Sequence, residues 1–201
     1  MAWSGYQGAP LRVLTVCTGN VCRSPLAERL LEVRLAAAGV PAVVASAGTG
    51  ALVGEDMTEP TAELVARYGG AQRPQRARQL TVAMLENADL VLTASRSHRA
   101  EAVSELPRAN RYAFTLREFA RLAETARAEN DFEIEDLASP AALVRAVGSY
   151  RGYLPPLASP DDDDVIDPYR RPQEFYDETG RVLDDATRVI ASVLGKPRAD
   201  G

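Results

Sequence analysis

Cysteine and histidine are scarce in this chain of 201 residues, which holds two cysteines and one histidine. Two cysteines, Cys17 and Cys22, exclude a disulfide-rich scaffold. They also exclude a zinc site built from four cysteines or from two cysteines and two histidines. Mechanisms that pair a nucleophile with a histidine are disfavoured, because His98 would have to serve in every case.

Long apolar runs and an excess of basic residues are also lacking. No apolar run approaches the ~20 residues that cross a bilayer, and the first ten residues lack the basic and apolar regions of a signal peptide. With 23 Lys and Arg against 28 Asp and Glu, the net charge is -5, which argues against a general nucleic-acid binder. We therefore expect a cytoplasmic protein that binds neither nucleic acid nor membranes.

The chain does contain an alternation of short apolar segments and amphipathic helical segments. Strands are expected at residues 11–16, 42–45, 90–93 and 111–114, and the last helix is expected over Gln173 to Leu194. This alternation predicts an α/β fold, a three-layer sandwich with a central four-stranded parallel sheet flanked by helices. Such a Rossmann-like sheet binds ligands beyond the carboxyl ends of its strands.

The domain organisation is expected to be simple. Residues 1–10 are rich in Gly, Ser and Pro and predict a flexible leader, and residues 11–201 predict a single domain. Residues at about 129–164 fit the alternation poorly and are interpreted as an insertion that is too short for a core of its own. We expect its carboxyl end to lie near a pocket mouth, and the acidic run Asp161 to Asp164 to be a solvated loop.

The most informative segment is CTGNVCRSP, residues 17–25, directly after the first expected strand. The backbone N–H groups of a loop that opens a helix can converge on an anion. Gly19 and Asn20 tolerate the positive φ values that such a loop requires. Arg23 can hold two oxygens of a tetrahedral oxyanion, and the Ser24 hydroxyl can donate to the Cys17 sulfur.

A thiol at a helix N-terminus beside an arginine is favoured as thiolate, the nucleophilic form. A Cys17 thiolate under a bound phosphate would be placed for in-line attack on phosphorus. The loop lacks G-x-x-x-x-G-K-[ST] and any lysine, which excludes a nucleotide-binding P-loop of that type. The structural alternative is a strand-to-helix turn with two buried cysteines. In either case we expect Ser24 to cap the helix that follows and Pro25 to occupy its first position.

The segment CTGNVCRSPLAE resembles the signature of the low-molecular-weight protein tyrosine phosphatases. The resemblance extends in order to SAGTG (residues 46–50), RARQL (76–80), ADLVLT (88–93) and DPY (167–169). It implies a phosphate-binding loop after the first strand. It also implies hydrolysis of phosphate monoesters, most notably phosphotyrosine in proteins or a small aryl phosphate, through a cysteinyl-phosphate intermediate. It implies no metal or other cofactor.

The resemblance also implies roles for individual residues. Cys17 would be the nucleophile, Arg23 would stabilise the transferred phosphoryl group, and Asp167 would be the general acid and base. Ser46 would support the loop through Asn20, and a reversible disulfide between Cys22 and Cys17 would protect the nucleophile. Leu52 and Tyr169 would line the substrate pocket. A phosphate or sulfate ion would bind to the loop residues Thr18, Gly19, Asn20, Val21, Cys22, Arg23 and Ser24.

Several positions depart from the family's pattern. Leu52 is aliphatic where an aromatic residue is common, Arg170 replaces a second aromatic residue, and Gln75 stands where many relatives have a histidine. Val21 is closer to the tyrosine-directed members than to those acting on phosphoarginine. The alternatives are a phosphoarginine phosphatase, an arsenate reductase that uses an external thiol, and an oxyanion-binding module without turnover. We expect a monomer or weak dimer, with His98 on the surface of a helix.

Overall fold

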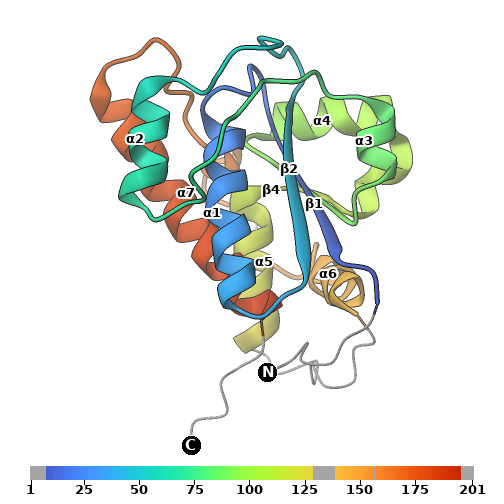
Figure 1. Ribbon diagram of the computed structural model, residues 1–201. Coiled ribbons are helices and arrows are strands. Elements are labelled where there is room, and N and C mark those ends of the chain that lie inside the picture. The colour runs from blue at the N-terminus through green and yellow to red at the C-terminus, as the bar shows by residue number, and fades with distance from the viewer. Residues whose placement is uncertain (1–7, 129–138, 156, 196–201) are drawn as a thin grey trace, which may run out of the picture.

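A four-stranded parallel sheet forms the centre of the protein (Figure 1). The computed structural model describes residues 8–128, 139–155 and 157–195. The strand order is β2-β1-β3-β4, so that β1 lies between β2 and β3. The strands are β1 (Leu11–Cys17), β2 (Ala42–Gly48), β3 (Leu90–Thr93) and β4 (Ala113–Thr115). All the pairings are parallel, as predicted from the alternation of strands and helices.

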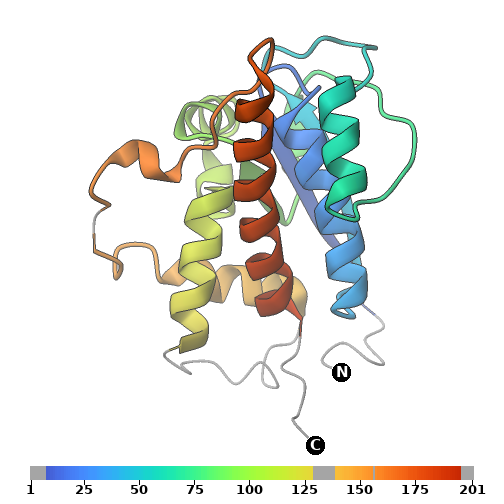
Figure 2. The ribbon, with the colours of Figure 1, turned by 90° about the vertical axis from the view of Figure 1, so that its left-hand side faces the viewer.

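Helices cover both faces of the sheet, which confirms the predicted three-layer sandwich (Figures 1 and 2). One face packs against α1 (Arg23–Ala37), α2 (Glu59–Arg67), α5 (Leu116–Ala128), α6 (Pro140–Ser149) and α7 (Gln173–Leu194). The other face packs against α3 (Val82–Glu86), α4 (Arg96–Glu105) and the 3-10 helix η1 (Pro107–Arg111). In the described residues, no helix has the length and apolarity that a membrane crossing requires.

The side chains of β1 explain how the nucleophile candidate is placed. Successive residues of a strand point to opposite faces of the sheet. Leu11 and Val13 belong to the core on the α1 and α7 side, whereas Leu14 and Val16 belong to the core on the α3 and α4 side. Cys17 continues the first set and ends the strand, so its sulfur emerges on the face where α1 begins.

The predicted insertion packs on the main core where the structure describes it. Helix α6 belongs to this segment and lies against α5 and α7 (Figure 2). Leu143, Val144 and Val147 are fully buried in the same core cluster as the side chains of those helices. Residues 129–138 of the insertion and residues 1–7 of the expected leader lie outside the described residues.

The prediction that the acidic run is a solvated loop is wrong for part of the run. The 3-10 helix η3 (Pro160–Asp163) places Asp163 in contact with Arg121 of α5, at 3.0 Å between Oδ2 and Nη2. Asp163 is 9% exposed, and burial raises the pKa of its carboxyl group although Arg121 opposes the shift. Asp161 and Asp164 contact Arg96 of α4. These arginines lie far away in the sequence, so the acidic run by itself did not reveal its partners.

Candidate active site

Asn20 fixes the conformation of the loop between β1 and α1. Asn20 has a φ of 56° and is fully buried, and asparagine is one of the few residues with a side chain that adopt this left-handed conformation readily. Its amide nitrogen donates to Ser24 Oγ and to Ser46 Oγ, both at 2.9 Å. Its amide oxygen accepts from the backbone N–H of Arg78 at 3.0 Å. The contact between Asn20 and Ser46 is thus the one that the family resemblance implied.

The Cys17 sulfur lies at the base of this loop. Its nearest polar partner is Ser24 Oγ, at 3.0 Å. The expectation that Ser24 caps the helix is wrong, because α1 begins at Arg23 and Cys22 occupies the cap position, where its side chain makes no capping hydrogen bond. The Ser24 hydroxyl is instead shared between the sulfur, Asn20 and the carbonyl oxygen of Ala47.

Arg23 joins the loop to the segment that carries Asp167. Its side chain is 7% exposed, and its Nη2 lies 2.7 Å from Asp167 Oδ2. Its Nη1 donates to the carbonyl oxygen of Val165 at 3.2 Å, while its buried Nε has no partner among the described residues. The backbone N–H of Val165 donates in turn to Ala94, at the end of β3. Asp167 and Cys17, which are far apart in the sequence, therefore meet at the carboxyl end of the sheet.

These side chains surround a cavity of about 140 Å³. Asp167 is half exposed at the cavity, whereas Cys17 and Arg23 are buried at its base. Leu52 and Tyr169 belong to the lining, as predicted for the substrate pocket. The lining comprises Cys17, Thr18, Gly19, Val21, Cys22, Arg23, Gly50, Leu52, Asp167 and Tyr169. A nucleophile, a cation and an acid thus open into one space.

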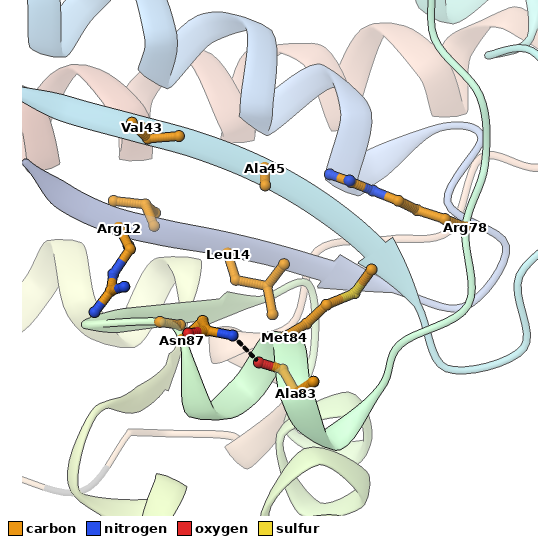
Figure 3. Close-up of a pocket in the computed structure, with 10 residues that line it drawn as sticks. Arg12, Leu14, Val43, Ala45, Arg78, Ala83, Met84 and Asn87 are labelled. Carbon is orange, nitrogen blue, oxygen red and sulfur yellow. Dashed lines mark hydrogen bonds between the residues drawn. The ribbon is translucent and has the colours of Figure 1, made fainter.

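A larger hollow of about 270 Å³ lies between the sheet and α3 (Figure 3). Leu14, Ala45 and Met84 give it mainly apolar walls, with Arg12 and Asn87 at one end. No cysteine, hydroxyl, carboxylate or imidazole group belongs to its lining. The chemistry therefore belongs to the smaller cavity at Cys17.

The geometry agrees with the comparison to known proteins. Residues 12–137 match the family described as low molecular weight phosphotyrosine protein phosphatase. A low molecular weight protein-tyrosine-phosphatase from Streptomyces coelicolor is 31% identical over 185 residues, which cover 90% of this chain and 93% of that protein. This chain belongs to the low molecular weight phosphotyrosine protein phosphatase family.

Other relatives are similar in sequence over a shorter part of the chain, or are similar in their solved structures. Etp of Escherichia coli K12 is 40% identical over 96 residues, which span 47% of this chain and 62% of that protein, less than two thirds of its length. The enzyme from T. tengcongensis is 29% identical, with a TM-score of 0.65 over 90% of this chain and 97% of that one. YwlE arginine phosphatase from Geobacillus stearothermophilus is 26% identical, with a TM-score of 0.63 over 90% and 91%.

This family member supports its loop through a buried carboxylate that the sequence analysis did not single out as a site residue. Ser46 Oγ donates to Glu28 Oε2 at 2.5 Å, and Glu28 is 3% exposed. Arg29 and Arg73 donate to the other oxygen of Glu28, at 3.2 and 2.7 Å. Gln75 accepts from Arg29 and makes no hydrogen bond to the loop. Two arginines thus compensate a buried negative charge that anchors Ser46.

The second loop cysteine is buried and reduced. Cys22 is 4% exposed, and its sulfur lies 3.5 Å from Thr58 Oγ1. Burial raises the pKa of the Cys22 thiol, with the hydroxyl of Thr58 acting in the opposite direction. Cys22 is therefore a thiol at neutral pH, and its disulfide with Cys17 stays a prediction. Among the described residues, no three histidine, cysteine or acidic side chains form a group suited to a metal ion.

The expectation that His98 lies on the surface is wrong. His98 is 4% exposed and its Nε2 lies 2.8 Å from Thr18 Oγ1, next to the nucleophile candidate. The cause is tertiary, since the parallel pairing of β1 with β3 places the start of α4 beside the Cys17 loop. A single histidine on a mainly polar helix gave no local signal of this contact.

Gly48, at the end of β2, permits the close approach of the loop. A Cβ atom at Gly48 would lie 2.2 Å from the carbonyl oxygen of Thr18 and 3.1 Å from the backbone of Ala51. We expect Gly48→Ala to displace the Thr18 peptide and to lower kcat/KM for an aryl phosphate by roughly 10²-fold, the cost of misplacing reacting groups by about 1 Å. Steady-state kinetics and thermal unfolding of the same preparation test this expectation.

Gly39→Ala is the matched control. Gly39 has a φ of 71° but no atom within 4 Å of an added Cβ, and it lies in the turn between α1 and β2. Its substitution should cost about 1–3 kcal/mol of stability through backbone strain, without a change in kcat/KM. Wild-type turnover by Gly48→Ala would contradict the assigned close contact.

Proposed function

We propose that this protein hydrolyses phosphate monoesters, with phosphotyrosine in proteins as its substrate, through a cysteinyl-phosphate intermediate. The observation that carries the proposal is the convergence of Cys17, Arg23 and Asp167 on one cavity at the N-terminus of α1. Binding an oxyanion would require the arginine and the loop amides, but neither a nucleophile nor an acid. The three side chains together favour turnover over simple binding.

In the first step the Cys17 thiolate attacks phosphorus, and the bond between phosphorus and the leaving oxygen breaks. The Ser24 hydroxyl, 3.0 Å away, donates a hydrogen bond that stabilises the thiolate. Arg23 and the N–H groups at the start of α1 stabilise the equatorial oxygens. The leaving phenolate oxygen takes a proton from Asp167. In the second step water attacks the cysteinyl phosphate, its proton passes to Asp167, and the thiolate departs with the electron pair of the S–P bond.

The ion pair between Arg23 and Asp167 places the candidate acid beside the phosphate site. In the structure Arg23 Nη2 lies 2.7 Å from Asp167 Oδ2. A bound phosphate group would compete with this carboxylate for the same guanidinium. The buried Arg23 Nε, which has no partner among the described residues, offers a further donor.

The cavity walls support an aryl substrate. Tyr169 supplies an aromatic ring and Leu52, 38% exposed, an aliphatic surface on which a phenyl ring can pack. The Arg170 guanidinium lies 5.1 Å from the Tyr169 ring centroid, so a positive charge stands at this wall. That charge repels the guanidinium group of phosphoarginine, which phosphotyrosine lacks. The likeness to an arginine phosphatase keeps phosphoarginine as the second candidate.

One substrate panel tests the proposal. A tyrosine-phosphorylated peptide, the same peptide carrying phosphoarginine, and arsenate with a small thiol are each offered to the wild-type enzyme. We expect kcat/KM for phosphotyrosine to exceed that for phosphoarginine by roughly 10-fold or more, the discrimination available to one pocket contact. Faster release of phosphate from the phosphoarginine peptide would show that phosphoarginine, and not phosphotyrosine, is the substrate. Arsenate reduction without phosphatase activity would show that the protein is an arsenate reductase.

A cytoplasmic location and a monomer or weak dimer stay predictions from the sequence.

A further inference from the structure

His98 makes two side-chain hydrogen bonds that connect α4 to the Cys17 loop. Its Nε2 lies 2.8 Å from Thr18 Oγ1, and its Nδ1 lies 2.6 Å from Ser95 Oγ. Ser95 is the N-cap of α4, and its Oγ also accepts from the backbone N–H of His98. His98 is 4% exposed, so its contact with Ser95 is buried, and its contact with Thr18 is partly buried. The imidazole is therefore fixed by its own helix before it reaches the loop.

Thr18 is the residue that follows the nucleophile. It belongs to the lining of the cavity, and its carbonyl oxygen accepts from the backbone N–H of Gly50 at 3.1 Å. The contact with His98 therefore holds the side chain of a residue whose backbone is already held on the β2 side. Two anchors on opposite sides fix the orientation of the peptide groups between Cys17 and Gly19, at the start of the loop to which the proposed function assigns phosphate binding.

The hydrogen-bond pattern fits a neutral imidazole. A neutral ring has one donor and one acceptor nitrogen, and each hydroxyl group can take the complementary role. With Nε2–H donating, the Thr18 hydroxyl proton is free to point into the cavity. With Thr18 donating, Nδ1–H donates to Ser95. Both tautomers leave no ring nitrogen without a partner.

The surroundings keep the ring neutral. Burial is the main cause that lowers the pKa of His98, and Arg23 lowers it further. Glu101 on the same helix, and Asp164 and Asp167 on the segment after η3, act in the opposite direction. Because the folded protein holds a proton on His98 less tightly than the unfolded chain, its contribution to stability is full above the ordinary pKa of about 6.5. It is lost as the pH falls from that value toward the lower folded one.

We propose that His98 is a positioning residue that holds the Thr18 side chain and thereby sets the phosphate-binding loop beside Cys17. The proposal rests on the proposed function, because it names a group that acts on the same loop. His98 does not touch the substrate in this role. Its effect on catalysis passes through the Thr18 hydroxyl, so it should disappear when that hydroxyl is absent.

A double-mutant cycle tests this dependence. The proteins are the wild type, His98→Ala, Thr18→Val and the double variant, compared by kcat and KM with an aryl phosphate and by the affinity for inorganic phosphate. We expect each single variant to lose roughly 10- to 100-fold in kcat/KM, the usual effect of removing a partner that orients an active-site group. The double variant should lose no more than the larger single loss. His98→Gln, whose amide can still donate to Thr18, should recover part of the activity.

Controls separate this role from a general effect on the fold. Ala100→Gly weakens the exposed side of α4 without contacting the loop, so its thermal stability should fall while kcat stays unchanged. His98→Gln should also abolish the extra loss of stability that the wild type shows below about pH 6.5. Losses that multiply in the double variant, or wild-type kcat/KM in His98→Ala, would overturn the proposal. If no variant or wild type hydrolyses phosphate esters, the proposed function fails, and the phosphate-affinity cycle still decides the role of His98.

Discussion

Cys17→Ser should abolish turnover while leaving the phosphate site intact. We expect kcat for an aryl phosphate to fall by roughly 10⁵-fold or more, the scale for loss of the nucleophile in covalent catalysis. A serine hydroxyl at this position would keep the contact with Ser24, but it would remain protonated and a poor nucleophile at neutral pH. Steady-state kinetics over a long time course, and mass analysis of quenched enzyme for a phosphorylated residue, measure the two consequences.

Binding provides the control for this variant. The Arg23 guanidinium and the loop backbone do not depend on the sulfur for their positions, because Asn20, Ser46 and Val165 hold them. Inorganic phosphate should therefore bind Cys17→Ser with an affinity close to that of the wild type, measured by calorimetry. Turnover within 10-fold of the wild type would exclude Cys17 as the nucleophile. Loss of both turnover and binding would point to a collapsed loop.

Asp167→Asn should slow hydrolysis to a degree that depends on the leaving group. For a substrate with a poor leaving group, we expect kcat to fall by roughly 10²–10⁴-fold, the usual contribution of general acid catalysis. A nitrophenolate leaves without a proton, so its departure should be affected much less. The amide cannot accept a proton from water either, and the cysteinyl phosphate should persist longer. A leaving-group series at fixed pH, with rapid-quench detection of the intermediate, measures both effects.

Asp161→Asn is the matched control for the acid. Asp161 belongs to the same acidic stretch, but its side chain is 82% exposed and pairs with Arg96 on α4. Its substitution removes an exposed ion pair, which contributes at most about 1 kcal/mol to stability, and it should leave kcat unchanged for every leaving group. An equal loss in Asp161→Asn and Asp167→Asn would show that the acidic stretch acts through its overall charge. If the loss of kcat in Asp167→Asn did not depend on the leaving group, Asp167 would not be the general acid.

The predicted secondary structure agrees closely with the structure where the local pattern is strong. Strand β3 and helix α7 have the predicted bounds, because apolar spacing and flanking turns define them locally. β2 runs to Gly48, three residues beyond the predicted end at Ala45. The extension arises because β2 pairs with β1 as far as Cys17, and the sequence of β2 does not contain its partner.

Three errors share one physical origin. From the local sequence, Ser24 was expected to cap a helix, His98 to lie on the surface, and Asp163 to belong to a solvated loop. Each is instead buried against a partner that the local sequence does not reveal. Ser24 contacts the Cys17 sulfur, His98 contacts Thr18, and Asp163 contacts Arg121. Local composition predicts polar residues to be exposed, whereas a buried partner makes burial favourable. Glu28, compensated by Arg29 and Arg73, follows the same rule.

The sequence by itself determined the α/β alternation and the loop with Cys17 and Arg23, because these depend on residue types at short spacing. The choice of Asp167 as the candidate acid depended on the resemblance to the phosphatase family. Only the tertiary structure decided that Asp167 pairs with Arg23 across the carboxyl end of the sheet, that Gly48 must lack a side chain, and that His98 contacts Thr18. Parallel strands bring together loops that are separated by long crossovers. The contacts between those loops follow from strand order and register, which no single segment of the chain encodes.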